Sequence, residues 1–373
     1  MKPKIVFVRV ALLALFLALT PAALASTTWY VDGVNGNDDN DCKTDQAACR
    51  TIGHAISLCS AGDAIMVAPA TYTENLTLNF SLKIIGSSAV TTIVDGGGVG
   101  TVFWINNPAH VVLSKLTIQN GSASYYGGGI WNNGTLTVTH SIITGNYGYY
   151  GAGGINSYGT LTINYSTISG NWTDWDGGGI LTQGGTATII NSTVSGNGAR
   201  NSGGGINSGY YAGNNATLTI NNSTVSGNSG QGIINYDTLM INSSTVSGND
   251  LGIYQGGGSV KLQNSIVANN SKGNCYGAMT SSGYNLSSDN TCHFSGTGDL
   301  NNTHPRLGPL QNNGGPTQTM KLSSGSPAID AGNPSGCTDD KGNPLNTDQR
   351  GAPRPGKWDT GGCDMGAFER QQD

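Results

Sequence analysis

Residues 160–171 read Thr-Leu-Thr-Ile-Asn-Tyr-Ser-Thr-Ile-Ser-Gly-Asn, and residues 217–228 repeat them as Thr-Leu-Thr-Ile-Asn-Asn-Ser-Thr-Val-Ser-Gly-Asn. Two further close copies occupy residues 186–197 and 238–249, and a second phrase, Gly-Gly-Ile, stands between copies. The asparagines that close successive copies lie 20 to 31 residues apart and are Asn120, Asn146, Asn171, Asn197, Asn228, Asn249 and Asn269. A repeat of this period is typical of a solenoid, a propeller or an array of stacked units.

Within each copy the side chains alternate in character with a period of two. Leu161 and Ile163 are apolar, while Thr160 and Thr162 are polar, which is the pattern of a strand with one buried face. Gly-Asn and Gly-Gly mark turns, because glycine and asparagine accept a positive φ at low cost. Three short strands fit in each repeat, whereas a propeller blade needs four strands and about 40 residues. The sequence therefore predicts an all-β protein, a parallel β-helix whose single chain makes about nine or ten circuits, or rungs.

The repeats also predict which side chains stack inside the coil, because neighbouring strands lie about 4.8 Å apart. Two internal aliphatic ladders are expected, one of Ile130, Ile155, Ile180, Ile206, Ile233 and Ile253 and one of Ile143, Ile168, Val194, Val225, Val246 and Val267. The closing asparagines are expected to form a third ladder, in which each side-chain amide bonds to the next. Period and turn chemistry explain these residues, which therefore build the coil.

Composition restricts the kind of protein that this chain can be. Its 373 residues include 58 Gly and only 10% charged residues, as expected of a turn-rich repeat protein. The net charge is −5, and no basic cluster would attract nucleic acid. Residues 1–25 carry three basic residues around an apolar stretch and end in Ala-Leu-Ala, which indicates a secretory signal peptide. We expect a secreted protein without a transmembrane segment in its mature chain.

Seven cysteines follow the predicted signal peptide, and an oxidising compartment favours their pairing. The expected disulfides join Cys42 to Cys49, Cys275 to Cys292, and Cys337 to Cys363. Cys59 is left over, and it continues the apolar stripe of a helix predicted at residues 49–60. Its position predicts a buried free thiol.

Residues 26–63 are predicted to form an N-terminal cap. The helix at residues 49–60 would cover the apolar core and the unpaired strand edge at the open end of the coil. An acidic loop precedes this helix, and its candidate ligands for Ca²⁺, which favours clustered oxygen atoms, are Asp32, Asp38, Asp39 and Asp41. The loop lacks the spacing of an EF-hand, and a solvated loop is the simpler interpretation.

The repeats are predicted to run through residues 64–277, and residues 278–373 break with their pattern. This last segment is rich in Pro, Gly and Asn and contains short apolar runs. We expect it to add a final rung or two and then a terminal cap tied by a disulfide.

Two sets of motifs resemble known families. Residues 49–52, Cys-Arg-Thr-Ile, and residues 62–74, which begin Gly-Asp-Ala-Ile-Met-Val, resemble the N-terminal motif of secreted pectin-lyase-like proteins, whose fold is a right-handed parallel β-helix. Motifs near the end, among them Gly-Ser-Pro-Ala-Ile-Asp-Ala-Gly at 325–332 and Cys-Asp-Met-Gly-Ala-Phe-Glu at 363–369, are similar to the choice-of-anchor Q domain. The resemblance implies a secreted or cell-surface β-helix protein. It implies no defined reaction, because this fold hosts many functions.

Charged residues on the repeats are the candidates for catalysis. Lyases of the pectin-lyase-like group use calcium-binding carboxylates and an Arg or Lys base, and hydrolases of the group use clustered aspartates. Asp174 lies three residues after Asn171, and Arg200 lies three residues after Asn197. Stacking would place these two side chains side by side on adjacent rungs, with Asp176 nearby. A surface ion pair, worth less than about 1 kcal/mol, is the simpler interpretation.

Aromatic residues gather in the loops that follow three successive asparagine turns. They are Tyr125, Tyr126, Tyr147, Tyr149, Tyr150, Trp172 and Trp175, and all except Tyr147 are candidate ligand-binding residues. Flat rings beside carboxylates suit the faces and hydroxyl groups of sugars. The alternative is that the rings pack on one another and cover the loops.

Two functions therefore stay open. The first is a secreted or cell-surface rod that binds an extracellular polysaccharide or a partner surface, as an adhesin does. The second is a polysaccharide lyase or glycoside hydrolase. The scarcity of charged residues on the repeats favours the first.

Overall fold

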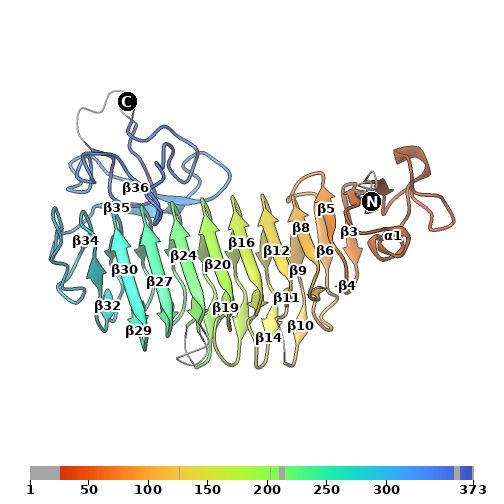
Figure 1. Cartoon of the computed structure of the whole chain (residues 1–373), viewed down its shortest axis with the longest axis horizontal. Coiled ribbons are helices and arrows are strands. Elements are labelled where there is room, and N and C mark those ends of the chain that lie inside the picture. The colour runs from red at the N-terminus through yellow and green to blue at the C-terminus, as the bar shows by residue number, and fades with distance from the viewer. Residues whose placement is uncertain (1–25, 126, 202, 210–214, 357–361, 372–373) are drawn as a thin grey trace, which may run out of the picture.

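The computed structural model describes residues 26–125, 127–201, 203–209, 215–356 and 362–371. The predicted signal peptide therefore lies outside the described residues. The described residues wind into a long coil of stacked parallel strands, with a smaller region packed along its upper side (Figure 1). This all-β parallel β-helix confirms the predicted fold class.

Three long sheets form the walls of the coil, and successive rungs add one strand to each. The eleven strands of sheet A are β1 (Thr28–Val31), β2 (Ala64–Val67), β5 (Leu82–Gly86), β8 (His110–Ser114), β12 (Thr135–Thr139), β16 (Thr160–Asn164), β20 (Thr186–Ile190), β24 (Thr217–Asn221), β27 (Thr238–Asn242), β30 (Ser259–Gln263) and β33 (Thr280–Ser281). The ten strands of sheet B are β3 (Ala70–Thr73), β6 (Thr92–Asp95), β9 (Thr117–Gln119), β13 (Ile142–Thr144), β17 (Thr167–Ser169), β21 (Thr193–Ser195), β25 (Thr224–Ser226), β28 (Thr245–Ser247), β31 (Ile266–Ala268) and β34 (Leu286–Ser287). The nine strands of sheet C are β4 (Leu76–Leu78), β7 (Phe103–Ile105), β11 (Ile130–Asn132), β15 (Ile155–Ser157), β19 (Ile180–Thr182), β23 (Ile206–Ser208), β26 (Gln231–Asn235), β29 (Leu251–Gln255) and β32 (Cys275–Tyr276). After β1, which precedes the first rung, these strands make nine rungs with all three walls and a tenth with two, in agreement with the predicted number.

Smaller elements complete the described structure. Sheet D follows sheet B along the chain in four successive rungs and consists of β10 (Ser122–Ala123), β14 (Tyr147–Gly148), β18 (Trp172–Thr173) and β22 (Gly198–Ala199). An antiparallel hairpin of β35 (Leu307–Gln311) and β36 (Thr319–Leu322) lies near the C-terminus. The helices are a 3₁₀ turn, η1 (Asp45–Ala47), and α1 (Ile52–Leu58). No helix of the described chain has the length and apolar character needed to cross a membrane.

Alternation along each strand decides which side chains enter the core. In β16, Leu161 and Ile163 are buried, while Thr160 and Thr162 face outward. Both predicted aliphatic ladders form, since Ile130, Ile155, Ile180, Ile206, Ile233 and Ile253 pair in register in sheet C and Ile143, Ile168, Val194, Val225, Val246 and Val267 pair in register in sheet B. All of these side chains are fully buried, so the repeats fix the register of the coil.

The asparagine ladder forms as well, but the prediction is wrong by one residue at each end. Side-chain amides bond in succession along Asn146, Asn171, Asn197, Asn228, Asn249 and Asn270. Asn120 and Asn269 instead hold the preceding turn position, with φ of 54° and 57°. Glycine fills that position in the other rungs, for example Gly145 with φ of 63°. Asparagine replaces it because its short polar side chain tolerates the left-handed conformation.

A short cap closes the N-terminal end of the coil. Helix α1 starts after Thr51, whose hydroxyl accepts a hydrogen bond of 3.2 Å from the backbone N–H of His54. The helix is shorter than the predicted one at residues 49–60. Its buried residues Ile52 and Ala55 join the core, and β1 pairs with β2 to extend sheet A.

All three predicted disulfides are present, joining Cys42 to Cys49, Cys275 to Cys292, and Cys337 to Cys363. Cys59 is free, as predicted, but it is half-buried rather than fully buried because it follows the last residue of α1. Burial, and then the charge of Asp63, raises the pKa of its thiol to about 12. The thiol is therefore protonated at neutral pH and is a poor nucleophile.

Residues 305–356 and 362–371, called the C-terminal region below, lie along the side of the coil (Figure 1). Three threonines on the outer face of sheet B bond to this region, Thr193 to Gln318 (2.7 Å), Thr224 to Gln349 (2.6 Å) and Thr245 to Ala367 (3.1 Å). The sequence predicts a terminal cap here, but the end of the coil is closed earlier in the chain, where Cys292 and Phe294 join the core. The repeat's outward threonines provide the hydroxyl groups that anchor the region.

The C-terminal motifs pack together as the core of this region. Arg354 is buried and pairs with Glu369 at 3.4 Å. Arg350 pairs with Asp348 at 2.7 Å, and its guanidinium lies 3.6 Å above the ring of Phe368. Their charged side chains therefore hold the region together and face no open site.

Candidate functional site

The aromatic loops are held in register by sheet D. Ser122 pairs with Tyr147, Tyr147 with Trp172, and Trp172 with Gly198. Residues at equal distances after these strands therefore repeat along the coil, so that Tyr125, Tyr150 and Trp175 follow one another on adjacent rungs. The loops share one corner of the coil, as the sequence predicts.

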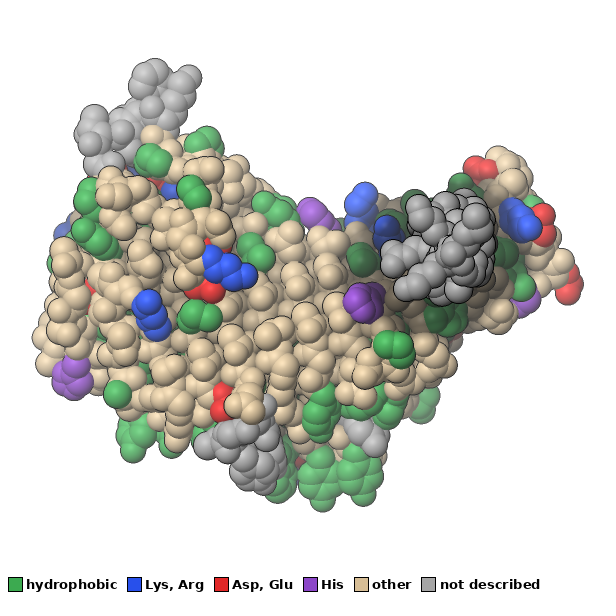
Figure 2. Space-filling model, in the orientation of Figure 1, with side chains coloured by type: hydrophobic (Ala, Val, Ile, Leu, Met, Phe, Trp, Pro, Cys, Tyr) green, Lys and Arg blue, Asp and Glu red, His purple; other side chains and the backbone are tan. Residues whose placement is uncertain are grey.

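The rings form a strip of contacting aromatic side chains on this corner. The ring centroids of Tyr125 and Tyr150 are 5.4 Å apart with an interplanar angle of 21°, and those of Tyr150 and Trp175 are 5.5 Å apart. Tyr149 meets Tyr150 edge-on at 4.5 Å. The rings thus touch one another, yet Tyr125 is 68% exposed and both Tyr149 and Tyr150 are 43% exposed. Figure 2 shows hydrophobic side chains gathered along this lower edge of the coil.

The other two predicted ligand-binding residues are Trp172 and Tyr126. Trp172 is 42% exposed, and its ring lies over Gly198 of the next rung. A β-carbon on Gly198 would come within 2.2 Å of that ring, so only glycine accommodates it. Tyr126 lies outside the described residues.

A second aromatic row, which the sequence analysis does not find, lies on the outer face of sheet C. Its members are Trp104, Trp131 and Tyr158, with centroids 4.2 Å apart for the first pair and 6.2 Å apart for the second. Trp104 donates a hydrogen bond to Asn106, and Tyr158 donates one to Gln183. The available signal for Trp104 and Trp131 is that each follows an inward apolar residue of sheet C, because alternation turns the next residue outward. Tyr158 follows the last residue of β15, and this signal does not mark it.

A groove connects the two aromatic rows. Ser122, Ala123, Ser124 and Tyr125 line two adjoining hollows. The first, of about 410 Å³, extends to Asn75, Leu76, Thr77, Gly100, Thr101 and Trp104. The second, of about 440 Å³, extends to Tyr147, Tyr149 and Tyr150. Because the lining residues come from successive rungs, the groove follows the long axis of the coil.

The candidate catalytic pair is present at the end of the aromatic strip. Arg200 and Asp174 are 3.5 Å apart on adjacent rungs, with their side chains 71% and 17% exposed. Burial, and then a hydrogen bond to Asp174, raises the pKa of Tyr147. Asp176 is half-buried. Burial, then Tyr254 and then the charge of Asp176 raise the pKa of Tyr236. Solvent screens so exposed an ion pair, which contributes less than about 1 kcal/mol to stability.

The acidic loop does not gather its carboxylates. Asp38 accepts hydrogen bonds from Arg50 and Thr51 at the start of α1. Burial alone would raise the pKa of Asp38, but these hydrogen bonds outweigh it and lower the pKa. Asp32 and Asp41 likewise accept hydrogen bonds from backbone N–H groups of their own loop. These carboxylates organise turns of the cap.

In the described part of the chain, the side chains of Cys42, Cys49 and His54 bring three possible metal-ligand atoms within 4.8 Å of one another. The two cysteines form a disulfide, which removes the thiolates that a metal would need. The four candidate calcium ligands of the acidic loop, Asp39 included, do not form such a group of ligand atoms among the described residues.

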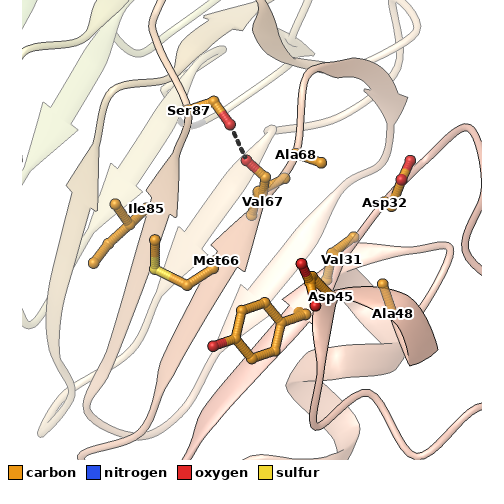
Figure 3. A pocket seen from close by; sticks show the side chains of 10 residues that line it. Val31, Asp32, Asp45, Ala48, Met66, Val67, Ala68, Ile85 and Ser87 are labelled. Carbon is orange, nitrogen blue, oxygen red and sulfur yellow. Dashed lines mark hydrogen bonds between the residues drawn. The ribbon is translucent and has the colours of Figure 1, made fainter.

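A smaller hollow of about 210 Å³ lies beside this cap (Figure 3). Its walls are formed by β1, β2 and β5, with Val31, Met66 and Ile85 among the lining side chains. Asp32 lies at its edge, and hydrogen bonds from Asn35 and then Val34 lower the pKa of that carboxyl group. The charged residues that line this hollow are two aspartates, Asp32 and Asp45, without a basic residue beside them. The aromatic groove is therefore the better candidate site.

The fold is shared with a pectate lyase. The crystal structure of pectate lyase Pel9A matches with a TM-score of 0.57 and 15% sequence identity, over 93% of this chain and 97% of that chain. A rhamnogalacturonan lyase matches with a TM-score of 0.44 and 13% identity, over 72% of this chain and 75% of that chain. No protein-family model matches the sequence, and no curated protein is similar to it. At this low sequence identity, the structural match to the pectate lyase establishes the fold alone. Function has to be argued from the site.

Proposed function

We propose that this protein binds an extended extracellular polysaccharide along the aromatic groove. The observation that carries the proposal is the register of Tyr125, Tyr150 and Trp175, exposed or half-exposed rings on three successive rungs beside a continuous groove. Each ring offers a flat apolar face at a surface in contact with water, and such a face can pack against the face of a sugar residue. A polymer rather than a single sugar fits a groove that continues from rung to rung.

Polar groups in the groove support the same ligand. Ser122 and Ser124 line its centre, and Asn75, Thr77 and Thr101 line its far end. Their hydroxyl and amide groups can donate and accept hydrogen bonds with sugar hydroxyls. Pectate lyase Pel9A, by its name, acts on a polysaccharide, so the fold is compatible with such a partner.

The three disulfides support secretion, because disulfides persist in oxidising compartments. We therefore place the protein outside the cell, free or at the cell surface. The signal peptide at residues 1–25 and the resemblance of the C-terminal motifs to the choice-of-anchor Q domain stay predictions of the sequence.

The ion pair between Asp174 and Arg200 favours a second candidate function, a polysaccharide lyase. In a lyase, Arg200 would first have to lose a proton to solvent, and its neutral guanidine would then take the proton from the ring carbon beside a sugar carboxylate. The glycosidic C–O bond on the next carbon would break, its oxygen would leave with a proton from water, and an unsaturated sugar would remain, while Asp174 would orient Arg200. The pair lies at the end of the strip, where a bound polymer would pass.

Substitution of the tryptophans tests the binding function. A glycan array identifies the ligand, and its affinity is then measured for Trp172→Ala with Trp175→Ala. Loss of each ring contact is expected to remove about 0.5–1.5 kcal/mol, so that the double variant binds on the order of tenfold more weakly. The melting temperature should change little, because neither tryptophan belongs to the apolar core.

Tyr276→Ala is the matched control, because Tyr276 is also exposed and stacked, on Tyr254, but lies at the far end of sheet C. Unchanged affinity in the double tryptophan variant, or an equal loss in the control, would refute the binding function. Arg200→Ala separates binding from catalysis. A binding rod should lose affinity modestly, whereas a lyase should lose its unsaturated product and keep its ligand.

A further inference from the structure

The corner between sheets A and B carries a row of residues in the left-handed conformation, one in each of seven successive rungs. They are Lys115, His140, Tyr165, Asn191, Asn222, Ser243 and Asn264, with φ between 46° and 56°. Backbone hydrogen bonds join neighbouring rungs at each of these positions. The C-terminal region covers the row from Asn191 onward, since Thr317 donates a hydrogen bond to the Asn191 carbonyl and Asn222 donates one to Thr347. Lys115, His140 and Tyr165 stay uncovered.

A hollow of about 320 Å³ lies over these three residues. Ile142 and Thr167 of sheet B contribute to its floor, Pro316 of the C-terminal region borders one side, and residues 87–90 border the other. Figure 2 shows the molecule notched here, between the C-terminal region and the N-terminal part of the coil. This hollow, called the saddle below, has the size of a small-ligand pocket.

The saddle is basic in a chain whose net charge is −5. Lys115 is exposed, and none of the ion pairs among the described residues involves it. His140 lies on the next rung, about one strand spacing away, and its Nδ1 shares a hydrogen bond of 2.9 Å with the Thr139 hydroxyl. A lysine ammonium is a compact charge that attracts anionic groups, and an imidazole adds a hydrogen-bond donor.

The saddle also offers a flat face. The rings of His140 and Tyr165 are stacked, with centroids 5.2 Å apart and an interplanar angle of 28°. Hydroxyl groups of Ser88 and Thr167 lie among the lining residues. A ring face, hydroxyl partners and a localised positive charge favour a charged sugar over an acidic peptide, because a peptide would use the charge alone.

We propose that the saddle binds an anionic sugar residue, one that carries a carboxylate or a sulfate ester. Lys115 and His140 hold the anionic group, and the Tyr165 ring supports the sugar. Sheet B separates the saddle from the aromatic groove, so this is a second site, independent of the proposed function.

Three related sugars test the proposal on the full-length mature protein. D-Glucuronate, D-glucose 6-sulfate and uncharged D-glucose share one ring and differ in charge, and their binding is followed by NMR titration. At least one anionic sugar should bind tenfold or more tightly than glucose, and its affinity should fall as NaCl is raised from 50 to 500 mM. Whichever anion binds more tightly identifies the anionic group.

The variants Lys115→Asn and His140→Asn should each weaken this binding fivefold or more. Asparagine suits both positions, because the row itself uses Asn191, Asn222 and Asn264 at the same backbone conformation. Lys261→Asn is the control, since Lys261 is exposed on β30 away from the saddle, and it should leave the affinity unchanged.

Equal binding of the three sugars, or no binding at all, would overturn the proposal. So would an equal effect of the Lys261 variant, or tighter binding of a hexaglutamate peptide than of either anionic sugar. The double tryptophan variant of the aromatic groove should bind the anionic sugar normally, which separates this outcome from the fate of the proposed polysaccharide site.

Discussion

Asn228 and Asn269 both close a repeat in the sequence, but only Asn228 belongs to the ladder. Its amide nitrogen donates to the Val194 carbonyl (3.1 Å) and to Asn249 Oδ1 (2.9 Å), and its Oδ1 accepts from the backbone and side-chain nitrogens of Asn197 (3.0 Å each). At about 0.5–1.5 kcal/mol for each hydrogen bond, loss of all four in Asn228→Gly is expected to cost about 2–6 kcal/mol.

The same substitution at Asn269 should have little effect on the free energy of unfolding. Asn269 is exposed and has φ of 57°, a conformation that glycine adopts without strain. Asn269→Gly is therefore expected to change the free energy of unfolding by less than about 1 kcal/mol.

Urea-induced unfolding, followed by circular dichroism at equilibrium, measures both free energies. The two variants carry an identical chemical change, so their difference reports the register of the ladder. Similar destabilisation of both variants, or a loss of less than 1 kcal/mol in Asn228→Gly, would refute the assignment of Asn228 to the ladder and Asn269 to the glycine position.

Three further predictions follow from burial and close contact. Ile180→Asp places an unpaired charge in a fully buried position and should abolish the folded state; a cooperative melt near that of the parent would contradict the register. Gly198→Ala should displace the Trp172 ring, shift its fluorescence and weaken glycan binding with little change in melting temperature; unchanged fluorescence would show that the ring does not lie there. Burial raises the pKa of Asp364 from 3.8 to about 6, so the folded state holds this proton more tightly than the unfolded state. The contribution of Asp364 to stability should fall as pH rises from about 4 to about 6, and an unchanged pH dependence in Asp364→Asn would count against this.

The coil could be predicted because its signals are local and repeated. The alternation of Leu161 and Ile163 with threonines places one face of a strand in the core, and the near-constant period then aligns Ile155 with Ile180 and Ile206. Short sequence separations also made the disulfide of Cys42 with Cys49 predictable. The same reasoning placed Asp174 beside Arg200, because equal distances from two ladder asparagines become neighbouring positions in a stack.

The second aromatic row shows where local patterns fail. Trp104 and Trp131 occur once each in otherwise dissimilar rungs, so no repeat marks them as a pair. Only the pairing of β7 with β11 brings them together. The groove that Trp104 shares with Tyr125 arises from loops of different lengths, and the period of the repeat contains no information about loop conformation.

The sequence by itself determined the coil, its inward ladders and the corner at which the aromatic loops gather, since each depends on spacing along the chain and on strand geometry. The tertiary structure decided where the C-terminal region packs. Thr193, Thr224 and Thr245 look like every other outward threonine of the repeat, yet they anchor this region through contacts more than a hundred residues apart in sequence. Such contacts depend on how the surfaces of the coil and of the C-terminal region fit together, and that fit leaves Lys115 and His140 uncovered beside Pro316. The saddle therefore exists only in the folded chain.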